Sequence, residues 1–427
     1  MPDTGTAPNR LRIALVTRAI YPAHGVGGLE RSTYDLARHL LPHGVRLHIV
    51  TRPGRAPAAG DPLASPAVRW HHVPYRTFPF AGRRGTTVLD RSTAYPVFGY
   101  LAGRLAAQLV ANHEVDVVIG NGASALGYAV ARHRDPTATA PFVLNPHGLE
   151  EFGGPDGRFG GHRLKRLAYA LLRAAVRRSA KSADCVIATD RVLMPVIGRH
   201  LGISADRMAV VPNAVDLPGC DALACPEDGV RLRGASGLDP HVPVLLSVGR
   251  LEHNKGLHVL AAALAQMQDL PWQWVVVGDG PFRARLERSI GDAGLDARAR
   301  LCGRVDDATL HAWYEAASLF VHPTLYEGSS IVTLEAMAHR RPVVATTAGG
   351  LPDKVRPGES GWLVPPGDAA ALAAALREAL AVPGDWPAMG AAGRALVERE
   401  FSWARSAARM LDVCAGLAAT ELAGRSR

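Results

Sequence analysis

Two glutamates, Glu327 and Glu335, stand eight residues apart where a loop leads into a helix-like pattern. The loop Glu327-Gly328-Ser329-Ser330 is followed by apolar residues with helical spacing from Ile331 onward, so Glu335 falls about one turn inside the helix. A helix N-terminus offers N–H groups and a positive dipole end to a phosphate. Glu327 lies on one side of that phosphate position and Glu335 on the other. This suits a ligand that has hydroxyls on both sides of a phosphate, such as a diphosphate between a sugar and a ribose. A glutamate in a first turn also stabilises the dipole without any ligand.

A second loop in the same half carries two cations. Residues 244–248 form an apolar run that predicts a buried strand, and Gly249-Arg250 follows it directly. Lys255-Gly256 comes just before a second helical pattern. Open α/β sheets bind ligands beyond the carboxyl ends of their strands, so both side chains are expected at such an edge. Arginine offers a planar fork and lysine a point charge, the two usual ways of holding a diphosphate.

Further turns follow strand-like runs, in the order Gly278-Asp279-Gly280-Pro281, Gly303 and Gly349-Gly350-Leu351-Pro352. With the two loops above, this ordered set resembles glycosyltransferase family 4, whose members are retaining, sugar-nucleotide-dependent enzymes of the GT-B fold. The similarity is densest between residues 243 and 367. It extends more thinly through Gly27-Gly28-Leu29-Glu30, Asn145-Pro146-His147-Gly148 and Asn213-Ala214-Val215-Asp216. Each motif is weak alone, but their order and spacing make the resemblance specific.

The resemblance implies a set of site residues. We expect Glu327 to contact the donor sugar and Glu335 to bind the ribose hydroxyls. The residues expected to be catalytic are His147, Arg250, Lys255 and Glu327. The residues expected to bind the donor are Gly27, Gly28, Arg250, Lys255, Gly278, Gly280, Glu327, Gly328, Ser329, Ser330, Ile331 and Glu335.

Two of these assignments depend on the resemblance more than on the residues. The glycines at 25–28 are also compatible with an ordinary tight turn, and a lone histidine such as His147 is more often a solvated or core side chain. The chain also departs from the family, because Gly328-Ser329-Ser330 replaces the Gly-Phe-Gly that many members carry. The donor sugar is therefore not copied from a relative. A UDP-linked donor is the first expectation, from family frequency.

The implied reaction transfers a sugar from a nucleoside-diphosphate sugar to a hydroxyl or amine of a glycolipid, a polysaccharide or a small natural product. Fixed cations would stabilise the charge that grows on the departing diphosphate. No Asp-x-Asp triplet occurs in the chain, so neither a metal ion nor another cofactor is expected. A sugar-nucleotide epimerase of the same fold is the alternative. A dehydrogenase is disfavoured, because the glycines at 25–28 lack the third glycine of a dinucleotide fingerprint.

The fold class expected is α/β, with two Rossmann-like, doubly wound parallel-sheet domains facing a cleft, as in the GT-B fold. Strand-like and helix-like runs alternate through 427 residues, of which 48% are hydrophobic. A stretch from 217 to 242, rich in Pro, Gly, Asp and Cys, reads as a break between the halves. We therefore expect an acceptor-binding domain at 1–217 and a nucleotide-sugar-binding domain at 218–397, with a C-terminal helix at 398–427 packing back on the first.

The net charge of +9 is unevenly spread, with +12 up to Leu217 and −3 in the remainder. Aromatic residues make up only 6% and no nucleic-acid motif occurs, so nucleic acid is not an expected partner. An anionic acceptor and a peripheral membrane contact through the basic N-terminal domain remain open. Residues 158–181 form a basic amphipathic pattern, for which a core-packed helix with a solvated outer face is the preferred interpretation.

Five scattered cysteines lack any Cys-x2-Cys pair, which indicates reduced thiols rather than a disulfide framework or a zinc site. Residues 1–12 carry no signal-like apolar segment, and no apolar run of membrane-spanning length occurs. The expected location is the cytoplasm, with the inner face of the membrane as a possible place of contact.

Overall fold

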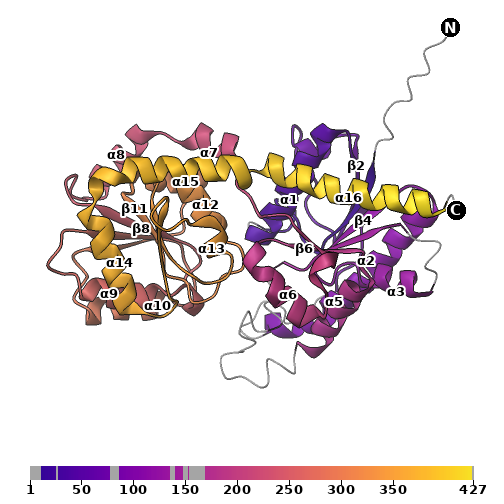
Figure 1. Ribbon diagram of the computed structural model, residues 1–427, viewed down its shortest axis with the longest axis horizontal. Coiled ribbons are helices and arrows are strands. Elements are labelled where there is room, and N and C mark those ends of the chain that lie inside the picture. Colours follow the sequence, from indigo (N-terminus) through magenta and orange to yellow (C-terminus); the bar gives the residue numbers. More distant parts are fainter. Residues whose placement is uncertain are drawn as a thin grey trace, which may run out of the picture. The chain divides into compact units, whose positions relative to one another are not determined.

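The computed structural model describes residues 11–25, 27–76, 86–134, 140–147, 152 and 169–425 (Figure 1). Contacts divide the chain into one unit of Met1–Pro212 with Trp403–Arg427 and a second of Asn213–Ser402. The expected boundaries were 217 and 397. The difference arises because the segments around Val215 and Ser402 form a parallel bridge, with the Val215 N–H donating to the Phe401 carbonyl at 2.9 Å. This bridge ties both linker segments into the second unit.

The first unit is built on a seven-stranded sheet in the order β3-β2-β1-β4-β5-β6-β7, and every strand pair is parallel. The strands are β1 (Arg12–Val16), β2 (Arg46–Thr51), β3 (Val68–His72), β4 (Val117–Asn121), β5 (Phe142–Asn145), β6 (Cys185–Ala188) and β7 (Met208–Val210). Strands β4, β5 and β6 are buried along their whole length, as expected for a parallel sheet covered on both faces. The strand order reverses between β1 and β4.

Helices and short 3₁₀ turns connect these strands. The helices are α1 (Gly28–Leu40), α2 (Thr86–Ala111), α3 (Leu126–Arg134), α5 (Ala170–Ser182), α6 (Met194–Leu201) and α16 (Trp403–Arg425). The 3₁₀ turns are η1 (Leu41–His43), η2 (Pro62–Ala64), η4 (Arg191–Leu193) and η5 (Ala205–Arg207). The C-terminal helix α16 belongs to this unit and packs against α1.

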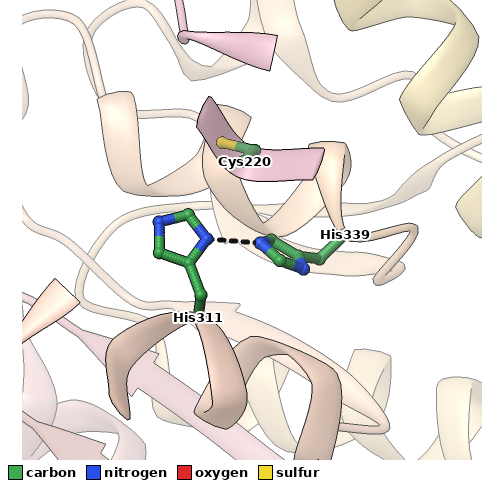
Figure 2. Close-up of side chains that lie close together, drawn as sticks. All are labelled: Cys220, His311 and His339. Atoms are coloured by element: carbon green, nitrogen blue, oxygen red, sulfur yellow. Dashed lines mark hydrogen bonds between the residues drawn. The ribbon is translucent and has the colours of Figure 1, made fainter. Parts of the chain in front are cut away.

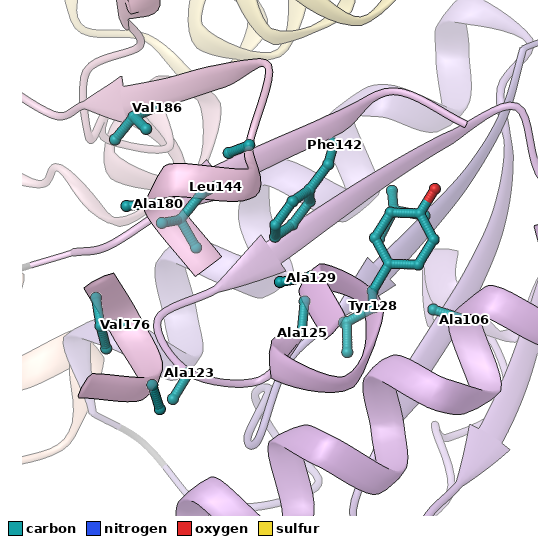
Figure 3. Close-up of a cluster of buried hydrophobic side chains, with 14 of the residues drawn as sticks. Ala106, Ala123, Ala125, Tyr128, Ala129, Phe142, Leu144, Val176, Ala180 and Val186 are labelled. Atoms are coloured by element: carbon teal, nitrogen blue, oxygen red, sulfur yellow. The ribbon is translucent and has the colours of Figure 1, made fainter. Parts of the chain in front are cut away.

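Helix α2 was not predicted from the sequence, because Pro96 interrupts its pattern. It packs closely on α3 through glycines. A Cβ on Gly127 would lie 1.9 Å from the Tyr100 carbonyl oxygen, so only glycine permits this approach. The core beneath contains Tyr128, whose hydroxyl donates to the Ala140 carbonyl at 2.6 Å and whose ring meets Phe142 edge-on at 5.5 Å (Figure 3).

Helix α5 contains the described part of the basic amphipathic segment; residues 158–168 lie outside the described residues, as do Glu150 and Glu151. The amphipathic pattern places Leu171 on the apolar face with Leu172 and Ala175, and this was wrong for Leu171, which is 63% exposed. The buried side chains of α5 are Leu172, Ala175, Val176, Ser179 and Ala180. The described part of the helix is therefore packed on the core along this face.

The second unit contains a six-stranded parallel sheet in the order β10-β9-β8-β11-β12-β13. The strands are β8 (Val244–Val248), β9 (Gln273–Val277), β10 (Ala299–Gly303), β11 (Leu319–His322), β12 (Val343–Thr346) and β13 (Gly361–Val364). The order reverses between β8 and β11. Two doubly wound parallel sheets are present, as predicted from the alternation of strand and helix patterns.

Two apolar cores lie on the faces of this second sheet, one lined by α9, α10 and α14 and the other by α7, α11, α12 and α15. The helices of the unit are α7 (Leu217–Leu223), α8 (Pro226–Ala235), α9 (Leu257–Ala265), α10 (Arg283–Asp292), α11 (Asp307–Ala316), α12 (Ile331–Ala338), α13 (Leu351–Lys354), α14 (Ala369–Ala381) and α15 (Trp386–Glu400). Its 3₁₀ turns are η6 (His253–Lys255) and η7 (Pro383–Asp385).

The stretch expected to be a break between domains instead contains helices α7 and α8, which both pack on α11. Each begins with a proline in its first turn, at Pro218 and Pro226. Proline suits that position, because the first N–H groups of a helix have no intrahelical partner. The two prolines that contributed to the prediction of a break therefore lie in the first turns of helices. None of the helices in the described part of the chain has the length and apolar character needed to cross a bilayer.

Candidate active site

Two loops flank the reversal point of the second sheet: residues 249–256 after β8 and residues 323–330 after β11. Because β8 and β11 are parallel neighbours whose connections run in opposite directions, their carboxyl ends mark the topological switch point at which such sheets bind ligands. The Asn254 carbonyl ties the loops together, accepting the Leu325 N–H at 2.7 Å and the Thr324 hydroxyl at 2.9 Å. The sequence-predicted Lys255 and Glu327 therefore come from adjoining loops.

The centre of this site is a cluster of Lys255, Glu327 and His322, in which the histidine is buried and the other two side chains are partly exposed. Lys255 Nζ lies 2.7 Å from Glu327 Oε2, and His322 Nε2 lies 3.0 Å from the same oxygen. Burial opposes ionisation of Glu327, but the His322 hydrogen bond and the Lys255 charge outweigh it and hold the pKa of this carboxyl below its usual range. Glu327 is thus a carboxylate at neutral pH, and 13% of its side-chain surface is exposed to solvent.

His322 was not predicted as a site residue. Burial lowers the pKa of its imidazole, so the ring is neutral at pH 7 and donates its Nε2–H to the Glu327 carboxylate. The usable signal was its position, since it is the polar last residue of a buried strand at the carboxyl edge of the sheet.

Arg250 lies on the same loop as Lys255 but contacts a different carboxylate. Its Nε lies 3.1 Å from Glu252 Oε1, and 70% of its side chain is exposed. An exposed pair of this kind contributes about 0–1 kcal/mol. The guanidinium can therefore leave Glu252 for a ligand at small cost, whereas Lys255 is held against a buried partner.

The start of α12 is organised by the two serines that distinguish this chain from many relatives. Ser330 is the N-cap, and its hydroxyl accepts the Thr333 N–H at 3.4 Å and lies 2.8 Å from the Thr333 hydroxyl. Ser329 accepts a hydrogen bond from Lys354 Nζ at 3.1 Å. Both hydroxyls are thus engaged within the protein, and the backbone of Gly328 and Ile331 lies in the same turn.

Lys354 was missed by the sequence analysis. It is fully buried and its Nζ also lies 3.4 Å from the Gly350 carbonyl. The signal was its place directly after Gly349-Gly350-Leu351-Pro352-Asp353, because a charged residue is rarely buried unless it is paired or holds a loop. Here it holds the loop that precedes α12.

Glu335 lies in the second turn of α12, and its hydrogen-bond partner differs from the partners of Glu327. The buried Tyr314 of α11 donates its hydroxyl to Glu335 Oε2 at 2.8 Å. The side chain of Glu335 is partly exposed. The structure therefore places the two glutamates on one loop–helix unit, each oriented by its own hydrogen-bond partners.

Gly278 and Gly280 have a structural reason to be glycine. A Cβ on Gly278, whose φ is +139°, would lie 1.9 Å from the Gly249 carbonyl oxygen, and one on Gly280 would lie 2.3 Å from that of Leu251. The loop after β9 therefore packs directly against the loop that carries Arg250. Contact of these glycines with a donor remains a prediction.

The remaining expected residues belong to the first unit. Gly27 is the N-cap of α1 and Gly28 its first residue, in the connection that follows β1 at the reversal point of that sheet. His147 follows β5 with a φ of +56°. Its Nε2 is buried without a hydrogen-bond partner among the described residues, and burial lowers its pKa to about 4, so the ring is neutral at pH 7.

Two doubly wound parallel-sheet domains form the architecture of the GT-B fold. Residues 26–218 match the family described as Glycosyltransferase Family 4 and residues 242–381 match Glycosyl transferases group 1. D-inositol 3-phosphate glycosyltransferase 1 of Catenulispora acidiphila is 30% identical over 96% of both chains. The chain belongs to glycosyltransferase family 4 and is a glycosyltransferase.

Other relatives and structures agree. A 2-deoxystreptamine glucosyltransferase of Streptomyces kanamyceticus is 31% identical over 56% of this chain and 62% of its own. Sucrose-phosphate synthase from Thermosynechococcus elongatus has the same fold, with a TM-score of 0.75, 25% identity and coverage of 96% of this chain and 100% of its own. The HepE structure from Anabaena in complex with UDP-glucose gives a TM-score of 0.69 at 22% identity, covering 95% of this chain and 100% of that one. Family membership favours transfer over the epimerase alternative.

The glycine at 349 provides a test of how tightly the site is packed. Its φ is +54°, and a Cβ there would lie 1.8 Å from the Glu327 carbonyl oxygen. We expect Gly349→Ala to displace the loop that carries Glu327, lowering stability by about 1–3 kcal/mol beyond the backbone strain and reducing turnover.

Gly358→Ala is the matched control, because Gly358 has a φ of +77° but nothing within 4 Å of its added Cβ. It should show only the strain of a left-handed alanine, about 1 kcal/mol. Denaturant unfolding and initial rates would be measured for both variants. Equal effects of the two substitutions would contradict the close-packing argument.

Proposed function

We propose that this glycosyltransferase acts with retention of configuration and without a metal ion in the reaction, using a nucleoside-diphosphate sugar, UDP-linked first, as donor. The observation that carries the proposal is the Lys255–Glu327–His322 cluster at the reversal point of the second sheet. It provides a fixed cation for a phosphate and, 2.7 Å away, an ionised carboxylate for sugar hydroxyls.

The diphosphate is assigned to Lys255, Arg250 and the N-terminus of α12. Lys255 is preorganised by its buried partner, and Arg250 is exposed enough to swing onto an anion. The first N–H groups of α12, at Ile331 and Val332, add the positive end of the helix dipole. Fixed donors of this kind stabilise charge that develops as the bond to the sugar breaks, with no need to reorganise solvent.

The two glutamates are assigned to opposite sides of the diphosphate. Glu327 is held as a carboxylate, so it can accept hydrogen bonds from the donor sugar hydroxyls. Glu335 is partly exposed and positioned by Tyr314, so its carboxylate can accept from the ribose hydroxyls. We assign Gly328 and the neighbouring backbone of Ser329 and Ser330 to the donor sugar and phosphate, since the serine hydroxyls already have partners.

The chemical step is assigned to attack from the face of the leaving group. An acceptor oxygen or nitrogen forms a bond to the anomeric carbon, the bond from that carbon to the diphosphate oxygen breaks, and the acceptor proton passes to the diphosphate. His147 is neutral at pH 7, and its buried Nε2 has no hydrogen-bond partner in the described part of the chain; we assign it to a hydrogen bond with the donor sugar. Gly27 and Gly28 are assigned to the close approach of backbone to ligand.

The donor and acceptor classes rest on the relatives and on charge. HepE was solved with UDP-glucose, which supports a UDP-sugar donor. The relatives named above act, by their names, on D-inositol 3-phosphate and on 2-deoxystreptamine, which are small hydroxyl- or amine-bearing acceptors. The charge of +12 up to Leu217 supports an anionic acceptor or an anionic membrane surface as the partner of the first unit.

A panel of nucleotide sugars tests the proposal. A bound donor at about 100 times its dissociation constant should stabilise the protein by about 2.7 kcal/mol. The donor so identified would then be used with candidate acceptors, with and without added magnesium or manganese, and the anomeric configuration of the product read by NMR. A product of inverted configuration, or turnover that requires the added metal, would show the proposed mechanism to be wrong.

The glutamate assignment predicts a split between two ligands. Glu335→Gln should weaken binding of the free nucleoside diphosphate about 10–100-fold, since a charged hydrogen-bond acceptor contributes about 1.5–3 kcal/mol. Glu327→Gln should weaken binding of the sugar-bearing donor more than that of the bare diphosphate. Calorimetry with both ligands measures the split, and Glu359→Gln, an exposed change before β13, is the control. Unchanged affinity of Glu335→Gln for the free nucleoside diphosphate, or equal losses for both ligands in Glu327→Gln, would refute the assignment.

The cation assignment predicts a loss of turnover. Lys255→Ala and Arg250→Ala should each lower turnover about 10²–10³-fold, the typical loss for one preorganised donor, with a smaller effect on donor binding. The double variant should be less impaired than the product of the single effects, because both side chains act on one group. Lys255→Arg should rescue poorly, since a planar fork does not replace a compact ammonium.

The structure supplies a control for each cation variant. Arg356→Ala removes a comparable exposed arginine, 4.0 Å from Glu400, and should leave turnover unchanged. Lys255→Ala also leaves the buried Glu327 without its cation, so its thermal midpoint must be checked at the assay temperature. Near-normal turnover in a folded Arg250→Ala or Lys255→Ala variant would refute the assignment of that residue to the diphosphate.

A further inference from the structure

A polar cluster separate from Lys255, Glu327 and His322 lies buried in the second unit, between helices α7, α11 and α12. Cys220 of α7, His311 of α11 and His339 at the C-cap of α12 are 5%, 8% and 3% exposed. Their sulfur and nitrogen atoms all lie within 4.8 Å of one another. Figure 2 shows the two imidazoles facing each other, with the cysteine on the neighbouring helix. None of these residues belongs to the proposed donor site.

His339 has the arrangement of a metal ligand with an outer carboxylate. His339 Nδ1 lies 2.5 Å from Glu315 Oε1, and Glu315 Oε2 lies 2.8 Å from an Arg341 nitrogen. The carboxylate can only accept, so Nδ1 of His339 carries the proton and Nε2 presents its lone pair inward. That lone pair faces His311 Nδ1 at 2.7 Å. A metal-binding histidine characteristically donates its other N–H to a carboxylate, which fixes its tautomer and orientation.

The donor set suits one class of ion. A thiolate and two imidazoles are the ligands of zinc and related borderline metals, at about 2.0–2.3 Å. In a tetrahedral site such ligand atoms stand about 3.3–3.7 Å apart, so the histidine nitrogens must separate by about half an ångström and the sulfur must move inward. Cys220, His311 and His339 supply three of the four ligands of such a site, and a water molecule would supply the fourth.

We propose that Cys220, His311 and His339 form a structural zinc site that joins α7, α11 and α12. Binding deprotonates the Cys220 thiol, whose proton passes to solvent, and moves the His311 proton from Nδ1 to Nε2. Both imidazoles stay neutral, and Glu315 keeps its hydrogen bond to His339. The ion takes no part in sugar transfer. It fixes helices that pack behind Glu335, since Tyr314 stacks on His339 at 5.3 Å and donates to Glu335.

The sequence pattern could not suggest this site. The scattered cysteines predict no zinc site, and the two histidines stand 28 residues apart. Only the packing of α7 on α11 and α12 brings the three ligands together. The competing interpretation is a buried network of neutral groups that binds no ion. A measurement of bound metal distinguishes this network from a zinc site.

The test uses the full chain without a polyhistidine tag, expressed in medium containing zinc or cobalt because the ligands are buried. We expect one equivalent of metal by elemental analysis. The cobalt form should show a thiolate-to-cobalt charge-transfer band, and the zinc form should unfold about 4 °C or more above the metal-free form. Wild-type protein that retains no stoichiometric metal would overturn the proposal.

Two cysteine variants make the test specific. Cys220→Ser should fold, by circular dichroism, but should lose the charge-transfer band and the thermal shift. Cys225→Ser, at a partly exposed cysteine on the next helix boundary, should keep both. His339→Gln should also lose stoichiometric metal. A charge-transfer band that survives Cys220→Ser, or that disappears in Cys225→Ser, would place the metal elsewhere and refute the site.

Discussion

The ion pair between Lys255 and Glu327 is the constraint on which the second unit's functional edge depends. Its 2.7 Å contact joins loops that follow strands β8 and β11. A carboxylate so little exposed is tolerable only when its charge is compensated, and here a lysine and a neutral histidine share one of its oxygens. The same requirement fixes the conformations of both loops, because neither side chain can leave without stranding the other. The loops at the reversal point are therefore preorganised by the groups proposed to act there.

Backbone contacts that only glycine permits support this arrangement. The left-handed Gly256 lies against the Pro323 carbonyl, and Gly349 lies against that of Glu327. In each case a Cβ would come within 1.9 Å of a carbonyl oxygen, far inside any allowed contact. The glycines of the family motifs thus act first on packing between loops, and through that packing on the position of the charged side chains. Function and close packing require glycine at these positions for the same physical reason.

Helix α12 connects the features of the second unit. Its N-cap, Ser330, adjoins the Glu327 cluster, its second turn presents Glu335, and its C-cap is His339. Tyr314 contacts two of these residues of α12, by a hydrogen bond to Glu335 and by stacking on His339. A short helix of this kind gains its stability from tertiary packing rather than from propensity. Whatever fixes its C-terminal end therefore also fixes the carboxylate proposed for the ribose.

Local information in the sequence was sufficient for the fold class, for most strands and for the loops that carry Arg250, Lys255, Glu327 and Glu335. Buried parallel strands read as continuous apolar runs, and glycine-rich turns mark their carboxyl ends. Helix α2 was missed because Pro96 interrupts its pattern, and α7 and α8 were missed because proline signals both a break and a helix start. The tertiary structure alone decided which polar groups meet: His322 with Glu327, Lys354 with Ser329, and Cys220 with His311 and His339. These encounters depend on how non-consecutive helices and strands pack, which no periodicity along the chain records.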